Sequence, residues 1–166
     1  METQVAFQDQ IPHNHCFGCG PNNAQGLQIK SYWQDDCTSI CNFSALPHHS
    51  AGPKGYLNGG IISTLIDCHA ICTSIADCYR ENNQHIGEGP VHWCVTGELN
   101  VRYLAPAPIA TPVQLIAKVT ETSGKKRIIE CKLYSVDQHD RTLCATASVV
   151  AIKVPESWLE SSSRIE

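Results

Sequence analysis

One long apolar helical pattern, at residues 58–80, most constrains what this chain can fold into. It follows a stretch rich in helix breakers at residues 47–55, and Asn58 stands at its start as a residue type that favours the N-cap position. Apolar side chains then recur at spacings of three and four, giving a broad stripe of Ile61, Ile62, Leu65, Ile66, Cys72 and Ala76. We therefore expect this helix to lie at the centre of the fold, covered by a second layer.

Six strand-like patterns flank the helix, two before it and four after it. They cover residues 26–34, 37–45, 95–104, 113–123, 127–137 and 142–154. The polar, glycine-bearing stretch 81–90 is expected to be a mobile loop. One helix against one antiparallel sheet is an α+β architecture, in which the sheet wraps around the helix. We expect a single domain over residues 1–166, with flexible segments at 1–12 and 156–166.

Asp67 is an unusual residue in a helix that is apolar nearly all round. A buried carboxylate is costly unless it is paired, hydrogen-bonded or used in chemistry. At the start of the same helix, Asn58, Gly59 and Gly60 leave N–H groups unshielded at the positive end of the helix dipole, which suits an anion or a polarised carbonyl oxygen. Together these features indicate hydrolysis or proton transfer at a carbonyl. The alternative is a buried acid satisfied by nearby hydroxyls, with glycines that allow close helix packing.

The distance between these two features predicts a shared site. Asp67 lies nine positions after Asn58, so the two are roughly 13 Å apart along the helix axis at about 1.5 Å per residue. One helix cannot bring its own carboxylate to a carbonyl held at its own N-terminus. Two copies related by a two-fold axis can do so, and we therefore expect a homo-oligomer, a dimer or a tetramer.

Composition narrows the classes of function. The chain is 42% hydrophobic and 17% charged, as is ordinary for a globular protein. Its net charge of −4 gives no indication of a basic surface that would bind nucleic acid or an anionic membrane. The first twenty residues lack a secretory signal pattern, and no segment is expected to cross a bilayer. Many of the ten cysteines sit inside apolar helix or strand patterns, where they are interpreted as small buried residues of a cytoplasmic protein: Cys68, Cys72, Cys94, Cys131 and Cys144.

A histidine- and cysteine-rich run near the start leaves two interpretations open. His13, His15, Cys16 and Cys19 resemble half of a metal site, because a C-x-x-C pair suits zinc. No second C-x-x-C pair follows, and one short run gives poor geometry for four ligands. The other interpretation is a glycine-rich turn that plugs one end of the domain. We expect this second arrangement, with no metal bound.

The motifs resemble the acyl-CoA thioesterases of the hotdog-fold superfamily, and most closely the phenylacetate-pathway thioesterases and the human thioesterase-superfamily members. The likeness extends over residues 15–154. Its centre is Gly-Tyr-Leu-Asn-Gly-Gly at 55–60 followed by Asp67, with support from Cys-Phe-Gly-Cys-Gly-Pro at 16–21, Gly26-Leu27, residues 96–104 and Pro106. It implies a hotdog fold, an antiparallel sheet wrapped around one long central helix.

The resemblance also implies hydrolysis of an acyl-CoA thioester to free acid and CoA, with no separate cofactor. Asp67 of one subunit would act as general base or nucleophile at a carbonyl polarised by Gly59 and Gly60 of another. Thr96 falls where relatives place a hydroxyl that orients the attacking water, and His49 falls in a loop expected to bind substrate. The cationic turn of Lys125, Lys126 and Arg127 is the densest candidate for the coenzyme's phosphates, although lysines in turns often serve only solvation.

One departure from the family pattern matters. Asn58 replaces the usual histidine before the two glycines; it can cap the helix and donate a hydrogen bond, but it cannot titrate near neutral pH. A non-catalytic acyl-CoA-binding hotdog protein is therefore the main alternative. Hydration of an enoyl thioester is a third, which the absence of an Asp/His dyad from the central helix disfavours.

Overall fold

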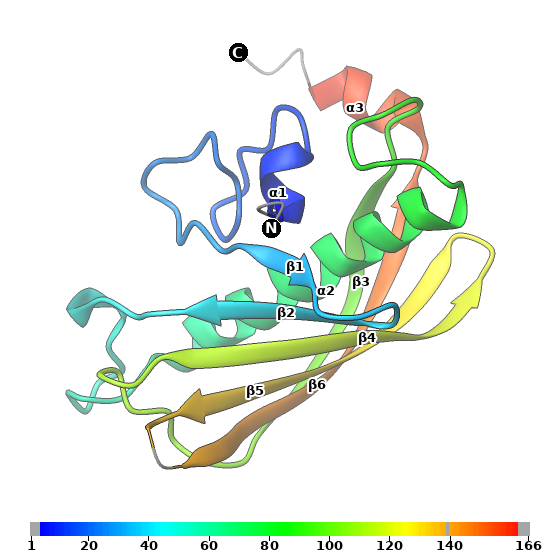
Figure 1. Cartoon of the computed structure of the whole chain (residues 1–166). Coiled ribbons are helices and arrows are strands. Elements are labelled where there is room, and N and C mark those ends of the chain that lie inside the picture. Colours follow the sequence, from blue (N-terminus) through cyan, green and yellow to red (C-terminus); the bar gives the residue numbers. More distant parts are fainter. Residues whose placement is uncertain (1–3, 139, 163–166) are drawn as a thin grey trace.

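The computed structural model describes residues 4–138 and 140–162 of the chain (Figure 1). The elements in chain order are α1 (Phe7–Gln10), β1 (Ser31–Trp33), β2 (Thr38–Phe43), a 3-10 turn (Pro47–His49), α2 (Gly59–Glu81), β3 (Trp93–Tyr103), β4 (Val113–Ser123), β5 (Lys126–Val136), β6 (Arg141–Val154) and α3 (Glu156–Ser162).

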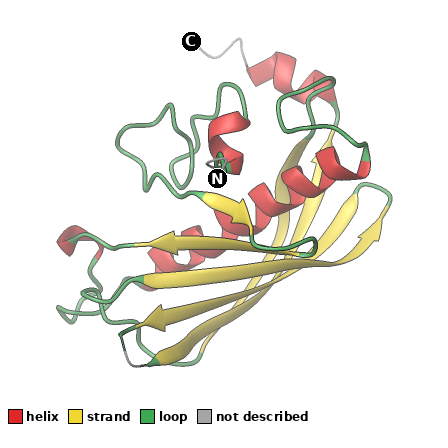
Figure 2. Ribbon diagram, in the orientation of Figure 1, coloured by secondary structure: helices red, strands yellow, loops and turns green. Residues whose placement is uncertain are grey.

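The strands form one six-stranded sheet in the order β1-β2-β4-β5-β6-β3, and every pair of neighbours is antiparallel. The sheet curves around α2, which crosses its inner face (Figure 2). This confirms the predicted α+β architecture of one long helix wrapped by an antiparallel sheet. The last four strands lie within two residues of their predicted bounds, because each is a long run of β-favouring residues that ends at a turn signal.

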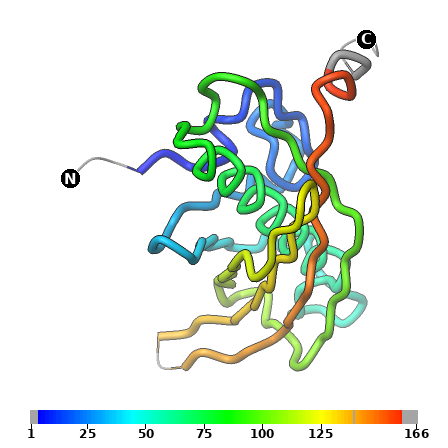
Figure 3. The backbone as a smooth tube through the Cα atoms, turned by 90° about the vertical axis from the view of Figure 1, so that its right-hand side faces the viewer, coloured from blue at the N-terminus to red at the C-terminus, as the bar shows by residue number. Residues whose placement is uncertain are grey.

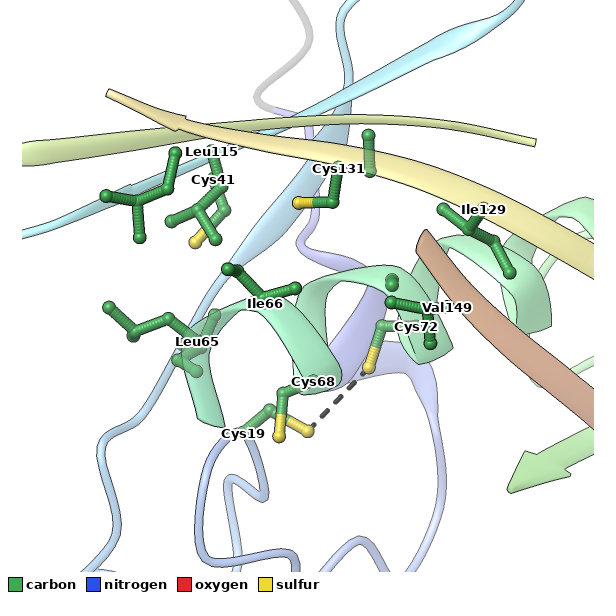
Figure 4. Close-up of a cluster of buried hydrophobic side chains, with 14 of the residues drawn as sticks. Cys19, Cys41, Leu65, Ile66, Cys68, Cys72, Leu115, Ile129, Cys131 and Val149 are labelled. Carbon is green, nitrogen blue, oxygen red and sulfur yellow. Dashed lines mark hydrogen bonds between the residues drawn. The ribbon is translucent and has the colours of Figure 1, made fainter. Parts of the chain in front are cut away.

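Helix α2 begins where its sequence predicts. The Asn58 side chain accepts hydrogen bonds from the backbone N–H groups of Gly60 at 2.8 Å and Ile61 at 3.3 Å, which satisfies two donors that the first turn leaves free. Ile66 on this helix points toward the sheet, where Leu115 and Cys131 project from β4 and β5 to meet it (Figure 4). Burial of these side chains fixes the helix in the hollow of the sheet.

Helix α2 also corrects one expectation, that no segment is apolar and long enough to cross a bilayer. Residues Gly59–Glu81 form a helix that is long and apolar enough to do so by length and composition alone. In the most apolar part of this helix, 61% of the residues are buried inside the protein. The apolarity of α2 is thus accounted for by its place in the core, where the sheet covers it on one side and the N-terminal segment on another.

The N-terminal segment differs from the flexible lead-in expected at residues 1–12. Its described part forms α1, and Phe7 and Ile11 are buried at 2% and 4% exposure. Residues 11–30 then run beside α2, on the side away from β5 and β6 (Figures 1 and 3). The segment is ordered by packing against the core, which no pattern within these few residues records.

The first strand is shorter than the predicted 26–34, because the chain before it bonds to a loop instead of a strand. Gln28 has a positive φ of 56°, which breaks an extended run. The N–H groups of Leu27 and Ile29 donate to the carbonyls of Phe17 and Gly18. Only Ser31–Trp33 therefore pair with β2.

A chain of buried polar side chains connects α1, β1, β2 and α2. Gln8 donates to Ser31 Oγ at 2.9 Å, and Ser31 Oγ lies 2.8 Å from Nδ1 of His69. Beyond His69 lie Ser39 and Thr73, whose hydroxyl oxygens are 2.6 Å apart. All five side chains are fully buried, and burial lowers the pKa of His69 to about 4, so the imidazole is neutral.

Candidate active site

Asp67 and Thr96 meet in the structure. Thr96 Oγ1 donates a hydrogen bond of 2.6 Å to Oδ1 of Asp67, across the gap between α2 and β3. Asp67 is half-buried, and this burial raises the pKa of its carboxyl above the ordinary value, an effect that the hydrogen bond from Thr96 partly opposes. The carboxylate thus has one oxygen fixed by a hydroxyl on a neighbouring strand.

An irregularity in β3 places Thr96 next to that carboxylate. The register between β3 and β6 shifts between Thr96 and Glu98, so Gly97 is the extra residue of a β-bulge. A side chain at Gly97 would bring a Cβ to 2.9 Å from Ile152 Cγ1, closer than real Cβ atoms approach other atoms, which explains the glycine. Bulges of this kind re-aim a side chain, and here the re-aimed side chain is Thr96.

Asp67 and Thr96 lie on the wall of a pocket of about 240 Å³. Its walls come from α2, from the first half of β3 and from the N-terminal segment, and most of them are apolar or carry thiols. The residues that line it are Ile11, Asn14, Cys16, Cys19, Asp67, Cys68, Ile71, Cys72, Ile75, Trp93, Cys94, Val95 and Thr96. The arrangement combines one fixed carboxylate with an apolar wall, as expected for a site that acts on a small apolar group.

The N-terminus of α2 lies outside this pocket. Asn58 already accepts from the N–H groups of Gly60 and Ile61, so among the described residues the Gly59 amide is the first-turn donor left without an acceptor. The carbonyl of Gly59 accepts a hydrogen bond of 2.7 Å from the Tyr103 hydroxyl, which also contacts Ser63. A single chain therefore keeps Asp67 and the first turn of α2 apart, as the spacing in the sequence predicts.

The predicted substrate-binding residues fall elsewhere on the surface or in the core. His49 is buried at 8% exposure, accepts a hydrogen bond from the Leu46 amide at Nδ1 and stacks on Phe43. Lys125 in the turn between β4 and β5, and Lys126 as the first residue of β5, are both exposed. None of these three residues lines the pocket that contains Asp67.

Arg127 corrects the prediction of a three-residue phosphate cluster. Its side chain points inward, and only 3% of the residue is exposed. The guanidinium pairs with Asp77 at 3.1 Å and with Glu81, both on α2. Its charge is thus neutralised within the fold. The side chain points inward because successive residues of β5 face opposite sides of the sheet, and Arg127 shares the inward side with Ile129 and Cys131.

The sequence did not indicate that two helix cysteines approach the N-terminal C-x-x-C pair. Cys16 and Cys19 come from the loop, and Cys68 and Cys72 come from one face of α2. The spacing of four between the helix cysteines places them on one face, and this was the available signal. His13 and His15 are exposed, and the described group of potential metal ligands here consists of cysteines.

The sequence pattern of a family described as "Thioesterase superfamily" matches residues 54–142, more than half of the chain. The matched region includes the N-terminus of α2, Asp67 and Thr96. The chain belongs to the thioesterase superfamily. Its single long helix and six-stranded antiparallel sheet form the hotdog fold.

Three comparisons place the chain within that superfamily. A thioesterase superfamily protein of Shewanella loihica PV-4, known from its crystal structure, is 31% identical with a TM-score of 0.61, over 86% of this chain and 96% of that one. Acyl-coenzyme A thioesterase THEM4 of Mus musculus is 30% identical over 112 residues, which are 67% of this chain and 42% of the mouse protein. THEM4 of Bos taurus is 26% identical over 155 residues, covering 93% of this chain and 57% of the bovine protein. The chain thus spans about half the length of these curated relatives.

Proposed function

We propose that this protein hydrolyses acyl-CoA thioesters to a free acid and CoA. The observation that carries the proposal is the Asp67 carboxylate, held by Thr96 at 2.6 Å on the wall of an apolar pocket. Membership of the thioesterase superfamily supports the same reaction, as does the name of the THEM4 relatives.

In the proposed reaction Asp67 activates water at the thioester carbonyl, or attacks that carbon directly. Thr96 holds one carboxylate oxygen, which leaves the other free to accept a proton from water or to form the bond to carbon. The carbonyl oxygen would be bound at the N-terminus of α2 of a second subunit, where the Gly59 amide has no acceptor among the described residues of its own chain. When water attacks, the CoA thiolate is expelled and takes up a proton from the protonated Asp67 carboxyl or from solvent. When Asp67 attacks directly, the thiolate leaves a mixed anhydride on Asp67, and water then hydrolyses this anhydride to the free acid and the restored carboxylate.

The pocket beyond Asp67 is the proposed site of the acyl group. Ile71 and Ile75 lie one and two turns further along α2, and Val95 lies beside them on β3. A volume of about 240 Å³ is small for a ligand pocket, so the wall that one chain provides favours a short or compact acyl group.

A second candidate function is binding of acyl-CoA without turnover. The side chain of Asn58 occupies two of the amides at the helix N-terminus, including that of Gly60. A carbonyl must then bind at Gly59 alone or displace the Asn58 cap. This competition weakens polarisation of the carbonyl more than it weakens burial of the acyl group.

Thiol release from a panel of acyl-CoAs, measured beside equilibrium binding of the same compounds, distinguishes the two candidates. Hydrolysis predicts release, and Asp67→Asn is expected to lower kcat by at least about a hundredfold, the scale for loss of a general base. Thr96→Val is expected to cause a smaller loss, and Thr96→Ser to recover most of it by restoring the hydroxyl. Binding without release by the wild type would favour the second candidate, and a folded Asp67→Asn variant with wild-type kcat would refute the role of Asp67.

A further inference from the structure

Four thiols converge between the N-terminal loop and α2. The sulfur of Cys16 lies 3.6 Å from that of Cys68, and the sulfur of Cys19 lies 3.7 Å from that of Cys72. The sulfurs of Cys16, Cys19 and Cys68 all lie within 4.8 Å of one another. Figure 4 shows Cys19 below the helix, with Cys68 and Cys72 on the helix face that turns away from the sheet.

The loop is shaped to bring its two cysteines onto the helix. Gly18 packs so closely that a Cβ there would lie 2.2 Å from Cys68 Sγ, so the loop reaches this position only with glycine. The Gly20 amide donates to the Cys16 carbonyl at 2.8 Å, which closes a tight turn around the C-x-x-C pair. The buried Asn14 amide lies 3.7 Å from Cys19 Sγ as a hydrogen-bond donor.

The Cys16–Cys68 and Cys19–Cys72 distances match the spacing of neighbouring ligands in a tetrahedral tetrathiolate centre. Cys72 lies outside the group of three sulfurs and joins it through Cys19. With Zn–S bonds of about 2.3 Å, the four sulfurs of a zinc site stand roughly 3.8 Å apart. A disulfide instead requires about 2.05 Å between its sulfurs, and no two of the ten cysteines are bonded in the structure. Two separate thiol pairs would also not account for a third sulfur within 4.8 Å of a pair.

We propose that Cys16, Cys19, Cys68 and Cys72 bind one zinc ion. Each thiol loses its proton to solvent on binding, and four sulfurs complete the coordination of the metal. Asn14 donates to a ligand sulfur from outside, as residues around metal centres commonly do. The ion would link the C-x-x-C turn of the N-terminal loop to the C-x-x-x-C pair on one face of α2.

The proposed zinc is structural. Four protein sulfurs leave no position for water or substrate, so the ion does not take part in the chemistry at Asp67. All four cysteines nevertheless line the pocket that contains Asp67, and Cys68 follows Asp67 directly on α2. The metal would tie the N-terminal loop to the helix and so fix one wall of that pocket.

The test is the metal content of the intact protein. Elemental analysis and native mass spectrometry of wild type, produced in zinc-containing medium, are expected to give about one zinc per chain. An organomercurial that caps thiols is expected to release it to a chromophoric chelator. Cobalt(II) in place of zinc is expected to give the intense visible bands of a tetrahedral tetrathiolate, a readout that does not depend on activity.

Single substitutions assign the ligands. Cys16→Ser and Cys72→Ala are expected to retain less than about a tenth of the zinc, because a three-sulfur site binds far more weakly. Cys37→Ser and Cys131→Ala, one exposed and one buried on β5, serve as matched controls and are expected to retain all of it. If a ligand variant fails to fold, the cobalt spectrum of the wild type still decides.

Two results would overturn the proposal. One is a wild-type protein that carries no zinc and gives no thiolate spectrum with cobalt, whether its four thiols are free or oxidised in pairs. The other is a metal that Cys16→Ser and Cys72→Ala hold as fully as wild type does.

Discussion

Arg127 and the two lysines before it carry equal charges but have different surroundings. Lys125 in the turn and Lys126 at the start of β5 are exposed, and a flexible cation there can follow a mobile phosphate. Arg127 is buried between β5 and α2 and is neutralised by Asp77 and Glu81. The lysines are therefore the part of this run that is free to bind the coenzyme, and the arginine belongs to the fold.

Replacing the lysines separates these roles. Lys125→Ala with Lys126→Ala is expected to raise KM for acyl-CoA several-fold with kcat nearly unchanged, as for loss of uniform binding, and to leave a short thioester without the nucleotide unaffected. Arg127→Met, the matched change, is expected instead to lower the free energy of unfolding by about 2–4 kcal/mol, because it removes the partner of the mostly buried Asp77 carboxylate. The loss stays moderate because Glu81 is partly exposed and recovers hydration. Steady-state kinetics and urea denaturation measure the two effects. Equal KM changes for both substrates would show that the lysines only solvate the turn.

How much of the candidate site could be predicted differs from residue to residue. Asn58 as the helix cap follows from local pattern, because it depends on position within one helix. Asp67 was expected to be buried and is half-buried, since its side chain lies on the wall of a pocket. The inward direction of Arg127 was also readable from its alternation with Ile129 and Cys131. The contact of Cys16 and Cys19 with Cys68 and Cys72 could not be predicted. It depends on where the N-terminal loop, about fifty residues away in the sequence, packs against α2.

Among the elements, α1 shows best how tertiary packing creates structure that local sequence does not encode. Four residues form too short a helix to be stable alone. Gln8 nevertheless makes two hydrogen bonds to Ser31, through its amide to Oγ and through its Oε1 to the backbone N–H. These bonds hold α1 against β1 and bring Ser31 to His69 on α2.

Removal of the Gln8 amide tests this connection. Gln8→Leu is similar in size but leaves the Ser31 amide without its acceptor, and the expected loss in the free energy of unfolding is about 1–3 kcal/mol, the cost of an unsatisfied buried polar group. Urea denaturation measures the loss. Asp9→Asn, on the exposed side of the same turn, is the control: its ion pair with Lys30 lies at the surface, so the change is expected to alter stability by less than about 0.5 kcal/mol. Equal stability of Gln8→Leu and wild type would show that the buried chain contributes nothing.

At the scale of the whole molecule, the candidate site is divided between two regions that one chain keeps apart. Asp67 lies in the pocket, and the first turn of α2 lies outside it. Strand β3, which carries Thr96, is an edge of the sheet eleven residues long, and its outer side pairs with no strand of the described chain. Leu99 and Tyr103 on this strand are exposed at 36% and 51%. A second subunit at this edge is therefore the arrangement we expect in the active protein.

Mixing two inactive variants tests the divided site. Asp67→Asn removes the carboxylate and Gly60→Val obstructs the first turn, where a Cβ would already lie 3.0 Å from Asn58 Oδ1. In a heterodimer one of the two sites has both intact parts, so full subunit exchange is expected to restore about a quarter of the wild-type rate. Thiol release after verified exchange measures it. No recovery would show that each chain carries a complete site.

The edge of β3, which pairs with no strand of the described residues, has a consequence for any chain that lacks a second subunit there. An edge strand presents a row of unpaired N–H and C=O groups, which is a template for pairing with any other extended chain. On β3 this row continues for eleven residues beside exposed Leu99 and Tyr103, with Glu98 and Arg102 as the charged side chains that discourage wrong pairing. Conditions that dissociate subunits are then expected to yield aggregates more readily than stable monomers, and a soluble single-chain form would need added lysines or a proline along this edge.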